Sequence, residues 1–200
     1  MPKRFLYLIR HGQYNSTPDF PYGKLTTVGE LQADLTGRFL VDIPVRVIHT
    51  SSMSRAAETA RIINANFYKV PLRQDNLLRE CVPTVPPRLE AHYSDYARSS
   101  PDFSMTDVLA HRIQADDAFA RYFKPPPLNA STDGHELIIC HGNIIRYFIS
   151  RAIDAPADSW ANLFMLNCGM SIVRIDDMGL MTVMTHNNVE HLPAHLRTEV

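Results

Sequence analysis

Cysteine is scarce in this sequence, and the few cysteines present are poorly placed for crosslinking. The 200 residues contain three, Cys81, Cys140 and Cys168, and these are far apart. An odd number of widely separated cysteines is not typical of a disulfide-bonded framework or of a structural zinc site. We therefore expect free thiols and a reducing compartment such as the cytoplasm.

An excess of charge of one sign and long apolar segments are missing as well. The chain has 20 Lys and Arg against 21 Asp and Glu, a formal net charge of -1, which argues against binding to nucleic acid or to an acidic membrane surface. No apolar run approaches the ~20 residues of a membrane span. The first apolar segment begins at about residue 4, which leaves no room for a targeting peptide. We expect one domain that needs no disulfide or metal for stability.

Short apolar runs alternate with helical patterns along the chain. Strands are predicted over residues 4–9, 45–49 and 136–140, and helices over about 27–41, 52–67 and 142–152. The first helix is predicted to begin with a capping box made by Thr27 and Glu30 and to bury a face that includes Leu31 and Phe39. Because strand-helix-strand order favours parallel pairing, we predict an α/β fold with three α/β/α layers and a mostly parallel sheet.

Two regions differ in texture from this pattern. Residues from about 81 to 129 are rich in proline, with Pro101 and the run 125–127 among them, and are predicted to form a small inserted lobe with one amphipathic helix over about 105–123. Further strands are predicted over 163–166, 170–175 and 180–184. Residues from about 186 to 200 are predicted to form a mobile tail.

The tripeptide Arg10-His11-Gly12 directly follows the first predicted strand. Two other predicted strands run into turns or helix starts at Thr50-Ser51 and at Cys140-His141. Because the carboxyl ends of parallel strands lie at the same edge of a sheet, we expect these segments to line one crevice. An arginine and a histidine beside a glycine turn are residue types that suit an anion, above all a phosphate group.

Four further segments accompany this tripeptide in a fixed order. They are residues 25–33, residues 50–60, the tripeptide Leu78-Arg79-Glu80 and the run Cys140-His141-Gly142-Asn143. At these segments, which span about residues 4–185, the chain resembles the histidine phosphatase superfamily, the group that contains the cofactor-dependent phosphoglycerate mutases. Around residues 49–56 and 141–147, and at Gln13-Tyr14, it is most similar to the branch of mitochondrial serine/threonine protein phosphatases.

The resemblance implies a phosphoglycerate mutase-like fold and a metal-independent phosphomonoester hydrolase that uses no cofactor. His11 is expected to attack phosphorus and become a phosphohistidine, and Glu80 to protonate the leaving oxygen. Arg10, Arg55 and His141 are expected to hold the phosphoryl oxygens, with His141 also serving in catalysis. The two arginines should lower the pKa of His11 and keep the imidazole neutral.

The resemblance also bears on the pocket and the substrate. Gln13, Asn15 and Asn143 are expected to line the pocket. The expected substrate is a serine/threonine phosphoprotein, with a small phosphomonoester or a mutase-type phosphotransfer as the alternative. The 60 residues between Glu80 and His141 favour hydrolysis, because mutases tend to carry a larger lid. A homodimer is expected at most, and a mitochondrial location if an upstream segment is missing.

Other interpretations of the sequence are weaker. Cys140 and Arg146 satisfy the Cys-x5-Arg spacing of cysteine-dependent phosphatases, but the residues between them run straight into an apolar helix rather than a phosphate-binding loop. His191 and His195 have a spacing that occurs in metal sites, yet Pro193 lies between them, so no metal site is expected. A catalytically inactive adaptor on the same fold is the remaining alternative.

Overall fold

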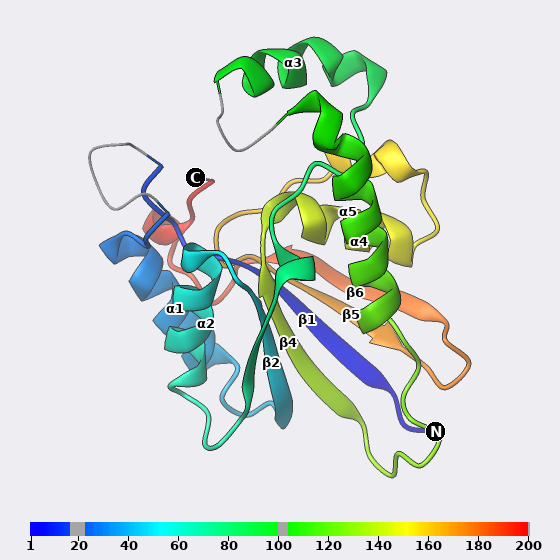
Figure 1. Ribbon diagram of the computed structural model, residues 1–200. Coiled ribbons are helices and arrows are strands. Elements are labelled where there is room, and N and C mark those ends of the chain that lie inside the picture. Colours follow the sequence, from blue (N-terminus) through cyan, green and yellow to red (C-terminus); the bar gives the residue numbers. More distant parts are fainter. Residues whose placement is uncertain (17–22, 100–103, 200) are drawn as a thin grey trace.

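The computed structural model describes residues 1–16, 23–99 and 104–199, so Pro101 lies outside the described part of the predicted lobe. The centre of the molecule is a six-stranded sheet with the order β3-β2-β4-β1-β5-β6 (Figure 1). Its strands are β1 (Arg4–Arg10), β2 (Val45–Ser51), β3 (Leu72–Asp75), β4 (Gly134–Cys140), β5 (Met170–Ile175) and β6 (Met181–Asn188). Strands β1 to β4 pair in parallel, and β5 is antiparallel to both of its neighbours. The predicted α/β fold with a mostly parallel sheet is confirmed.

Helices lie on both faces of this sheet. They are α1 (Thr27–Phe39), α2 (Ser54–Asn64), α3 (Glu90–Ser99), α4 (Val108–Tyr122) and α5 (Gly142–Ala152). Figure 1 shows α1 and α2 on one side, α4 and α5 on the other, and α3 standing above the sheet. Short 3-10 helices are found at Asn76–Leu78, Pro87–Leu89, Met105–Asp107, Ala157–Asn162 and Ala194–Leu196. None of the described helices is both long and apolar enough to cross a membrane.

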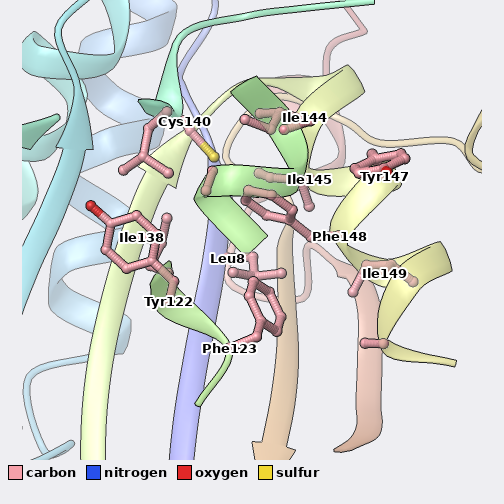
Figure 2. Packing of buried hydrophobic residues seen from close by; sticks show 14 of the residues in the cluster. Leu8, Tyr122, Phe123, Ile138, Cys140, Ile144, Ile145, Tyr147, Phe148 and Ile149 are labelled. Atoms are coloured by element: carbon pink, nitrogen blue, oxygen red, sulfur yellow. The ribbon is translucent and has the colours of Figure 1, made fainter. Parts of the chain in front are cut away.

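Helix α5 is fixed to the sheet by a dense apolar cluster (Figure 2). Ile145 and Phe148 of the helix share this cluster with Leu8 of β1 and Ile138 of β4, and all four are fully buried. Complete burial of such side chains contributes about 1.5–3 kcal/mol each. Because β4 passes into α5 through His141 alone, this packing also holds His141 at the edge of the sheet.

Helix α1 departs from the predicted cap and the predicted buried face. Its N-cap is Thr26, whose side chain accepts a hydrogen bond from the backbone N–H of Gly29 at 3.1 Å, so the expected capping box of Thr27 and Glu30 is wrong. Leu31 is 45% exposed. The buried face consists of small and polar residues, Gly29, Gln32, Ala33, Thr36 and Gly37. Small residues let α1 and α2 approach closely, which an apolar-periodicity argument does not anticipate.

The last part of the chain also differs from expectation. Residues 163–166, predicted as a strand, form an irregular loop. Strand β6 continues to Asn188, so the start of the expected mobile tail is part of the sheet. Beyond it, Leu192 and Leu196 are buried. These apolar side chains pack the last part of the chain against the rest of the domain, although the segment is rich in polar residues. The prediction of a mobile tail over residues 186–200 is therefore wrong.

The predicted lobe helix is present but divided. A 3-10 turn at Met105–Asp107 precedes α4, and α4 buries Ala115, Ala118 and Tyr122. Leu109 and Ile113, which match the apolar period, are more than half exposed. Helix α3 has no counterpart in the sequence analysis.

Candidate functional site

The carboxyl ends of β1, β2 and β4 meet at one edge of the sheet, as predicted. Arg10 ends β1 and pairs in register with Cys140, the last residue of β4. A cleft of about 710 Å³ opens at this edge. We call Arg10, His11, Tyr14 and Arg55 its sheet wall, because they follow β1 or start α2. We call Arg79, His92, His111 and Gln114 its lobe wall, because they lie in or beside α3 and α4.

His11 is held in one orientation at the base of the cleft. Its side chain is 2% exposed, and its Nδ1 lies 2.8 Å from the carbonyl oxygen of Gly12. Its Nε2 accepts a hydrogen bond from Nε of Arg55 at 3.1 Å. Both contacts are satisfied by a neutral ring with the proton on Nδ1 and the lone pair on Nε2. Burial, and then the charges of Arg55 and Arg10, hold the pKa of His11 well below its usual value.

Gly12 permits the turn that places His11. A Cβ atom at Gly12 would lie 2.5 Å from the carbonyl oxygen of Gly29 in α1. The backbone N–H of Gly12 donates to the hydroxyl of Thr59 at 3.0 Å, and that hydroxyl donates to the carbonyl oxygen of Arg55 at 2.7 Å. Thr59 therefore couples the loop that carries His11 to the helix that carries Arg55.

Arg55 is fixed from two directions. It stands at the start of α2 and is only 7% exposed. Its guanidinium carbon lies 4.6 Å from the centre of the Tyr14 ring, and that ring meets His11 edge-on at 5.2 Å between centroids. Such a cation over an aromatic face contributes about 0.5–2 kcal/mol. Tyr14 therefore aligns both the guanidinium group and the imidazole.

Arg10 and His141 bring partly unsatisfied polar groups to the same place. Nη1 of Arg10 donates to the carbonyl oxygen of Met165 at 2.6 Å, and Nε2 of His141 hydrogen-bonds the hydroxyl of Ser51 at 2.8 Å. Nε of Arg10 and Nδ1 of His141 are buried and have no hydrogen-bond partner among the described residues. Because buried polar groups are nearly always paired, two such atoms beside His11, whose ring centroid is 5.1 Å from that of His141, mark a site built for a polar ligand.

The surroundings of His141 also keep it uncharged. Burial, followed by the nearby His11, Arg55, Arg10 and Arg79, holds the pKa of His141 well below its usual value. A histidine that stays neutral below its usual pKa can still form a hydrogen bond with a ligand. It does so here without adding a charge to a region that already contains arginines.

Glu80 brings a carboxyl group to these cationic and imidazole groups. Its Oε1 accepts from the backbone N–H of Cys81 at 3.1 Å and its Oε2 from that of Asn143 at 3.4 Å. Burial raises the pKa of Glu80, and the charges of Arg55 and Arg10 oppose this rise only in part. A carboxyl group with a raised pKa can donate a proton and later take one back. A neutral imidazole, the fixed guanidinium groups of the arginines and a carboxyl group of this kind together suit the transfer of an anionic group.

The three residues expected to line the pocket have different places. Asn143 lines the cleft through the first turn of α5. Gln13 does not line it, and its side-chain oxygen accepts from the hydroxyl of Thr26 at 2.8 Å, at the cap of α1. Asn15 lines a separate, smaller pocket of about 350 Å³ next to α1. The expectation that Gln13 and Asn15 line the main pocket is therefore wrong, because the chain after His11 turns toward α1.

A polar network beneath His11 was missed by the sequence analysis. Nδ2 of Asn167 donates to the carbonyl oxygen of His11 at 3.2 Å, and the hydroxyl of Thr198 donates to Oδ1 of Asn167 at 2.9 Å. Gln32, fully buried in α1, donates to the hydroxyl of Thr198 at 2.9 Å and accepts from the backbone N–H of Gln13 at 2.8 Å. The one signal in the sequence that could have indicated this network is Gln32, an amide residue in the middle of an amphipathic helix.

The residues of the cysteine-phosphatase alternative are not arranged for that chemistry. Cys140 is fully buried in the apolar cluster, and burial raises the pKa of its thiol, so a thiolate is disfavoured. Arg146 instead binds the backbone oxygens of Gly142 and Leu163. Within the described residues, no group of three or more His, Cys, Asp or Glu side chains is placed to hold a metal ion.

The model of the histidine phosphatase superfamily (branch 1) matches residues 6–86 and 125–189 of this chain. Among curated proteins, the mitochondrial serine/threonine-protein phosphatase Pgam5 of Caenorhabditis elegans is 33% identical over 95% of this chain. The corresponding PGAM5 protein of Xenopus tropicalis is 34% identical over 88% of the chain. The chain spans 64% and 61% of the lengths of these two relatives.

Solved structures show the same architecture. Phosphoglycerate mutase from Plasmodium falciparum matches with a TM-score of 0.64 and 29% identity, over 97% of this chain and 96% of its own. The α-ribazole phosphatase from Shigella flexneri matches with a TM-score of 0.69 and 22% identity, over 92% of this chain and 96% of its own. The second likeness concerns the fold alone.

Proposed function

Since the chain belongs to branch 1 of the histidine phosphatase superfamily, we propose that it hydrolyses phosphomonoesters through a phosphohistidine formed on Nε2 of His11. The observation that carries this proposal is the fixed neutral state of His11, with Nδ1 bound to the carbonyl oxygen of Gly12 and Nε2 facing Arg55. We treat residues 1–200 as one phosphatase domain with residues 81–129 as its lobe.

The first half-reaction transfers the phosphoryl group to the enzyme. Nε2 of His11 attacks phosphorus, the N–P bond forms, and the P–O bond to the alcohol breaks. Glu80, which is protonated at this stage, gives its proton to the leaving oxygen. The ring of His11 gains positive charge as the bond forms, and the carbonyl oxygen of Gly12 stabilises it through Nδ1–H.

Three groups hold the phosphoryl oxygens during this transfer. The N–H of Arg55 exchanges Nε2 of His11 for a phosphoryl oxygen, while Nε of Arg10 and Nδ1 of His141 gain the partner that they lack in the unliganded site. Planar guanidinium groups match the geometry of phosphoryl oxygens. Because these donors are already held beside His11 before the substrate binds, they stabilise the transition state with little reorganisation.

The second half-reaction restores the enzyme. Glu80, now a carboxylate, removes a proton from water, and the water oxygen attacks the phosphorus of phosphohistidine. The P–N bond breaks, inorganic phosphate leaves, and His11 and protonated Glu80 are regenerated.

We further propose that the substrate is a phosphorylated serine or threonine side chain of a protein. The support for this is the likeness to mitochondrial serine/threonine-protein phosphatases over most of the chain. A mutase-type or small-molecule reaction is the second candidate, supported by the likeness to the Plasmodium falciparum phosphoglycerate mutase. A homodimer stays a prediction.

The deciding experiment joins turnover with trapping of the intermediate. Rates are measured on phosphoserine, phosphothreonine and phosphotyrosine peptides, on 3-phosphoglycerate and on p-nitrophenyl phosphate. In parallel, rapid quenching with a radiolabelled substrate should give a base-stable, acid-labile protein label. We expect hydrolysis of the phosphoserine and phosphothreonine peptides, and loss of both label and turnover in His11→Ala.

The matched control is Cys140→Ser, which removes the buried thiol and should retain most of the turnover. Loss of the label in Cys140→Ser with retention in His11→Ala would overturn the proposed nucleophile. Absence of turnover on every substrate would support the inactive adaptor. A higher kcat/KM on 3-phosphoglycerate than on any peptide would favour the second candidate.

A further inference from the structure

Arg79 differs from the other arginines that line the cleft. Arg10 and Arg55 are largely withdrawn from solvent and bound to a carbonyl oxygen and to His11. Arg79 is exposed, and with the described part of the chain its guanidinium group makes one long hydrogen bond, to the hydroxyl of Ser52 at 3.4 Å. That hydroxyl is already a donor to Asn76 at 2.6 Å. The guanidinium group of Arg79 therefore has most of its hydrogen-bonding capacity left for a ligand.

Arg79 directly precedes Glu80, and neighbouring residues of opposite charge can form an ion pair. The structure shows a different arrangement. Both oxygens of Glu80 face backbone N–H groups, those of Cys81 and Asn143. In the described ranges, Arg79 has no carboxylate within ion-pair distance. No described carboxylate therefore neutralises its positive charge on the lobe wall.

The backbone of Arg79 is nevertheless well anchored. Its N–H donates to the carbonyl oxygen of Asn76 at 3.1 Å, and its carbonyl oxygen accepts from Nε2 of Gln114 at 2.9 Å. The Gln114 amide reaches it from α4. The base of the side chain is thus fixed beside Glu80, while the guanidinium end can turn toward a ligand.

The cleft itself has room for more than a phosphoryl group. Its volume of about 710 Å³ lies within the range of sites that hold ligands of drug size, about 300–1,000 Å³. The lobe wall adds His92, His111 and Gln114 to Arg79, and among the described residues that line the cleft Glu80 is the only carboxylate. A substrate that extends along this wall therefore meets positive charge and hydrogen-bond donors.

We propose that Arg79 forms a second anion subsite, which binds a carboxylate or an additional phosphate of the peptide that carries the scissile phosphoryl group. This proposal rests on the proposed phosphatase function and specifies its substrate class. An Arg–carboxylate or Arg–phosphate contact of this kind is charge-assisted and commonly bidentate. The substrate is then an acidic phosphopeptide rather than any phosphorylated hydroxyl group.

The test compares three phosphothreonine peptides of equal length. One has Asp within two residues on both sides of the phosphothreonine, one has Asn at the same positions, and one has phosphoserine there. The wild-type protein should show a kcat/KM about tenfold higher on the Asp peptide than on the Asn peptide, mainly through KM. The Asp and phosphoserine peptides separate a carboxylate from a second phosphate as the bound group.

Arg79→Gln should bring the ratio of Asp to Asn peptide close to one. The matched control is Arg73→Gln, on the exposed edge strand β3 and outside the cleft, which should keep the wild-type ratio. Added salt should lower the preference in the wild-type protein and have little effect in Arg79→Gln.

Three results would overturn the proposed subsite. The first is that the wild-type protein hydrolyses the Asp and Asn peptides equally well. The second is that Arg79→Gln keeps the preference for the Asp peptide, and the third is that Arg79→Gln lowers kcat/KM by the same factor on p-nitrophenyl phosphate as on the Asp peptide. Absence of hydrolysis of all substrates by the wild-type protein would instead overturn the proposed function, so the two failures can be told apart.

Discussion

The two walls of the cleft are built in different ways. On the sheet wall, His11 and Arg55 are almost fully buried, and each is held by two or more contacts from strand ends or helix starts. On the lobe wall, Arg79 and His92 are exposed, and Gln114 is half-buried. Fixed groups with perturbed pKa values suit bond making and breaking. Exposed groups on separate helices suit recognition of a variable substrate.

Glu80 lies where the two walls meet, between the 3-10 turn at Asn76–Leu78 and the lobe. It shares the burial of the sheet wall, which raises the pKa of its carboxyl group, and it directly follows Arg79 of the lobe wall. The comparison therefore predicts that variants of the sheet wall and Glu80 change kcat, whereas variants of the lobe wall change KM and substrate preference.

The largest effect is expected for Glu80→Gln. Without the acid, hydrolysis of a phosphoserine peptide should fall roughly 100- to 10,000-fold. Formation of the phosphohistidine from p-nitrophenyl phosphate should fall far less, because nitrophenolate leaves without a proton. Burst kinetics on both substrates measure this difference. Equal losses of burst rate on the two substrates would contradict a role for Glu80 as the acid.

The same variant should alter the pH profile. Protonated Glu80 is lost as pH rises through its raised pKa, so the wild-type rate of the first half-reaction should fall on the alkaline side. His11 and His141 have lowered pKa values and stay neutral well below pH 6.5, so little loss is expected at mildly acidic pH. Single-turnover rates in Glu80→Gln should lack the alkaline limb.

Arg55→Ala should come next in size. Removal of a donor that stabilises the transition state typically costs about 100- to 1,000-fold in kcat. Loss of this cation should also raise the pKa of His11, because its charge is the second-largest cause of the depression, and rates should therefore fall at a higher pH on the acidic side. Arg61→Ala, at the exposed end of the same helix, is the control and should match the wild-type protein in both measurements.

Asn167→Ala tests whether the buried support of the sheet wall matters for rate. Loss of its bond to the carbonyl oxygen of His11 should lower stability by about 1–3 kcal/mol and kcat by roughly tenfold, with little change in KM. Thr198→Val should act in the same direction, and Thr198→Ser, which keeps the hydroxyl group, should restore the wild-type kcat. A destabilised Asn167→Ala with normal kcat would reduce this network to a structural role.

The smallest effect is expected on the lobe wall, for Gln114→Ala. This change removes hydrogen bonds to the carbonyl oxygens of Leu77 and Arg79. KM on acidic peptides should rise a few-fold, and stability should fall by about 1 kcal/mol. The control Gln74→Ala, on the exposed strand β3, should leave KM at its wild-type value. A loss in kcat instead of KM would break the division between the walls.

The sheet wall could be predicted from sequence because its residues follow apolar strands whose carboxyl ends must meet. Arg10 ends β1 and His11 directly follows it, and Arg55 lies in the first turn of α2, after β2. His141, next to this wall, directly follows β4. Their motifs are local, and a parallel sheet is enough to bring them together. The same rule led to the correct fold class.

The rest depends on contacts that no local pattern encodes. Asn167 lies in a loop with no recognisable motif, and its partner Thr198 comes from the segment predicted as a mobile tail. Helix α3 has a short polar sequence with no clear apolar period. The sequence places Arg79 next to Glu80, but it does not predict the direction in which the Arg79 side chain points. Long-range polar pairing and lobe geometry therefore had to come from the structure.

The link between Thr198, Asn167 and His11 has a consequence for biosynthesis. His11 is synthesised nearly 190 residues before Thr198, which supports it through Asn167. The nascent chain can therefore pair β1 with β4 well before the loop around His11 gains its last buried partner. The full rate of the proposed phosphatase should therefore be reached only after Asn167 and Thr198 have been synthesised and have folded against the loop that carries His11.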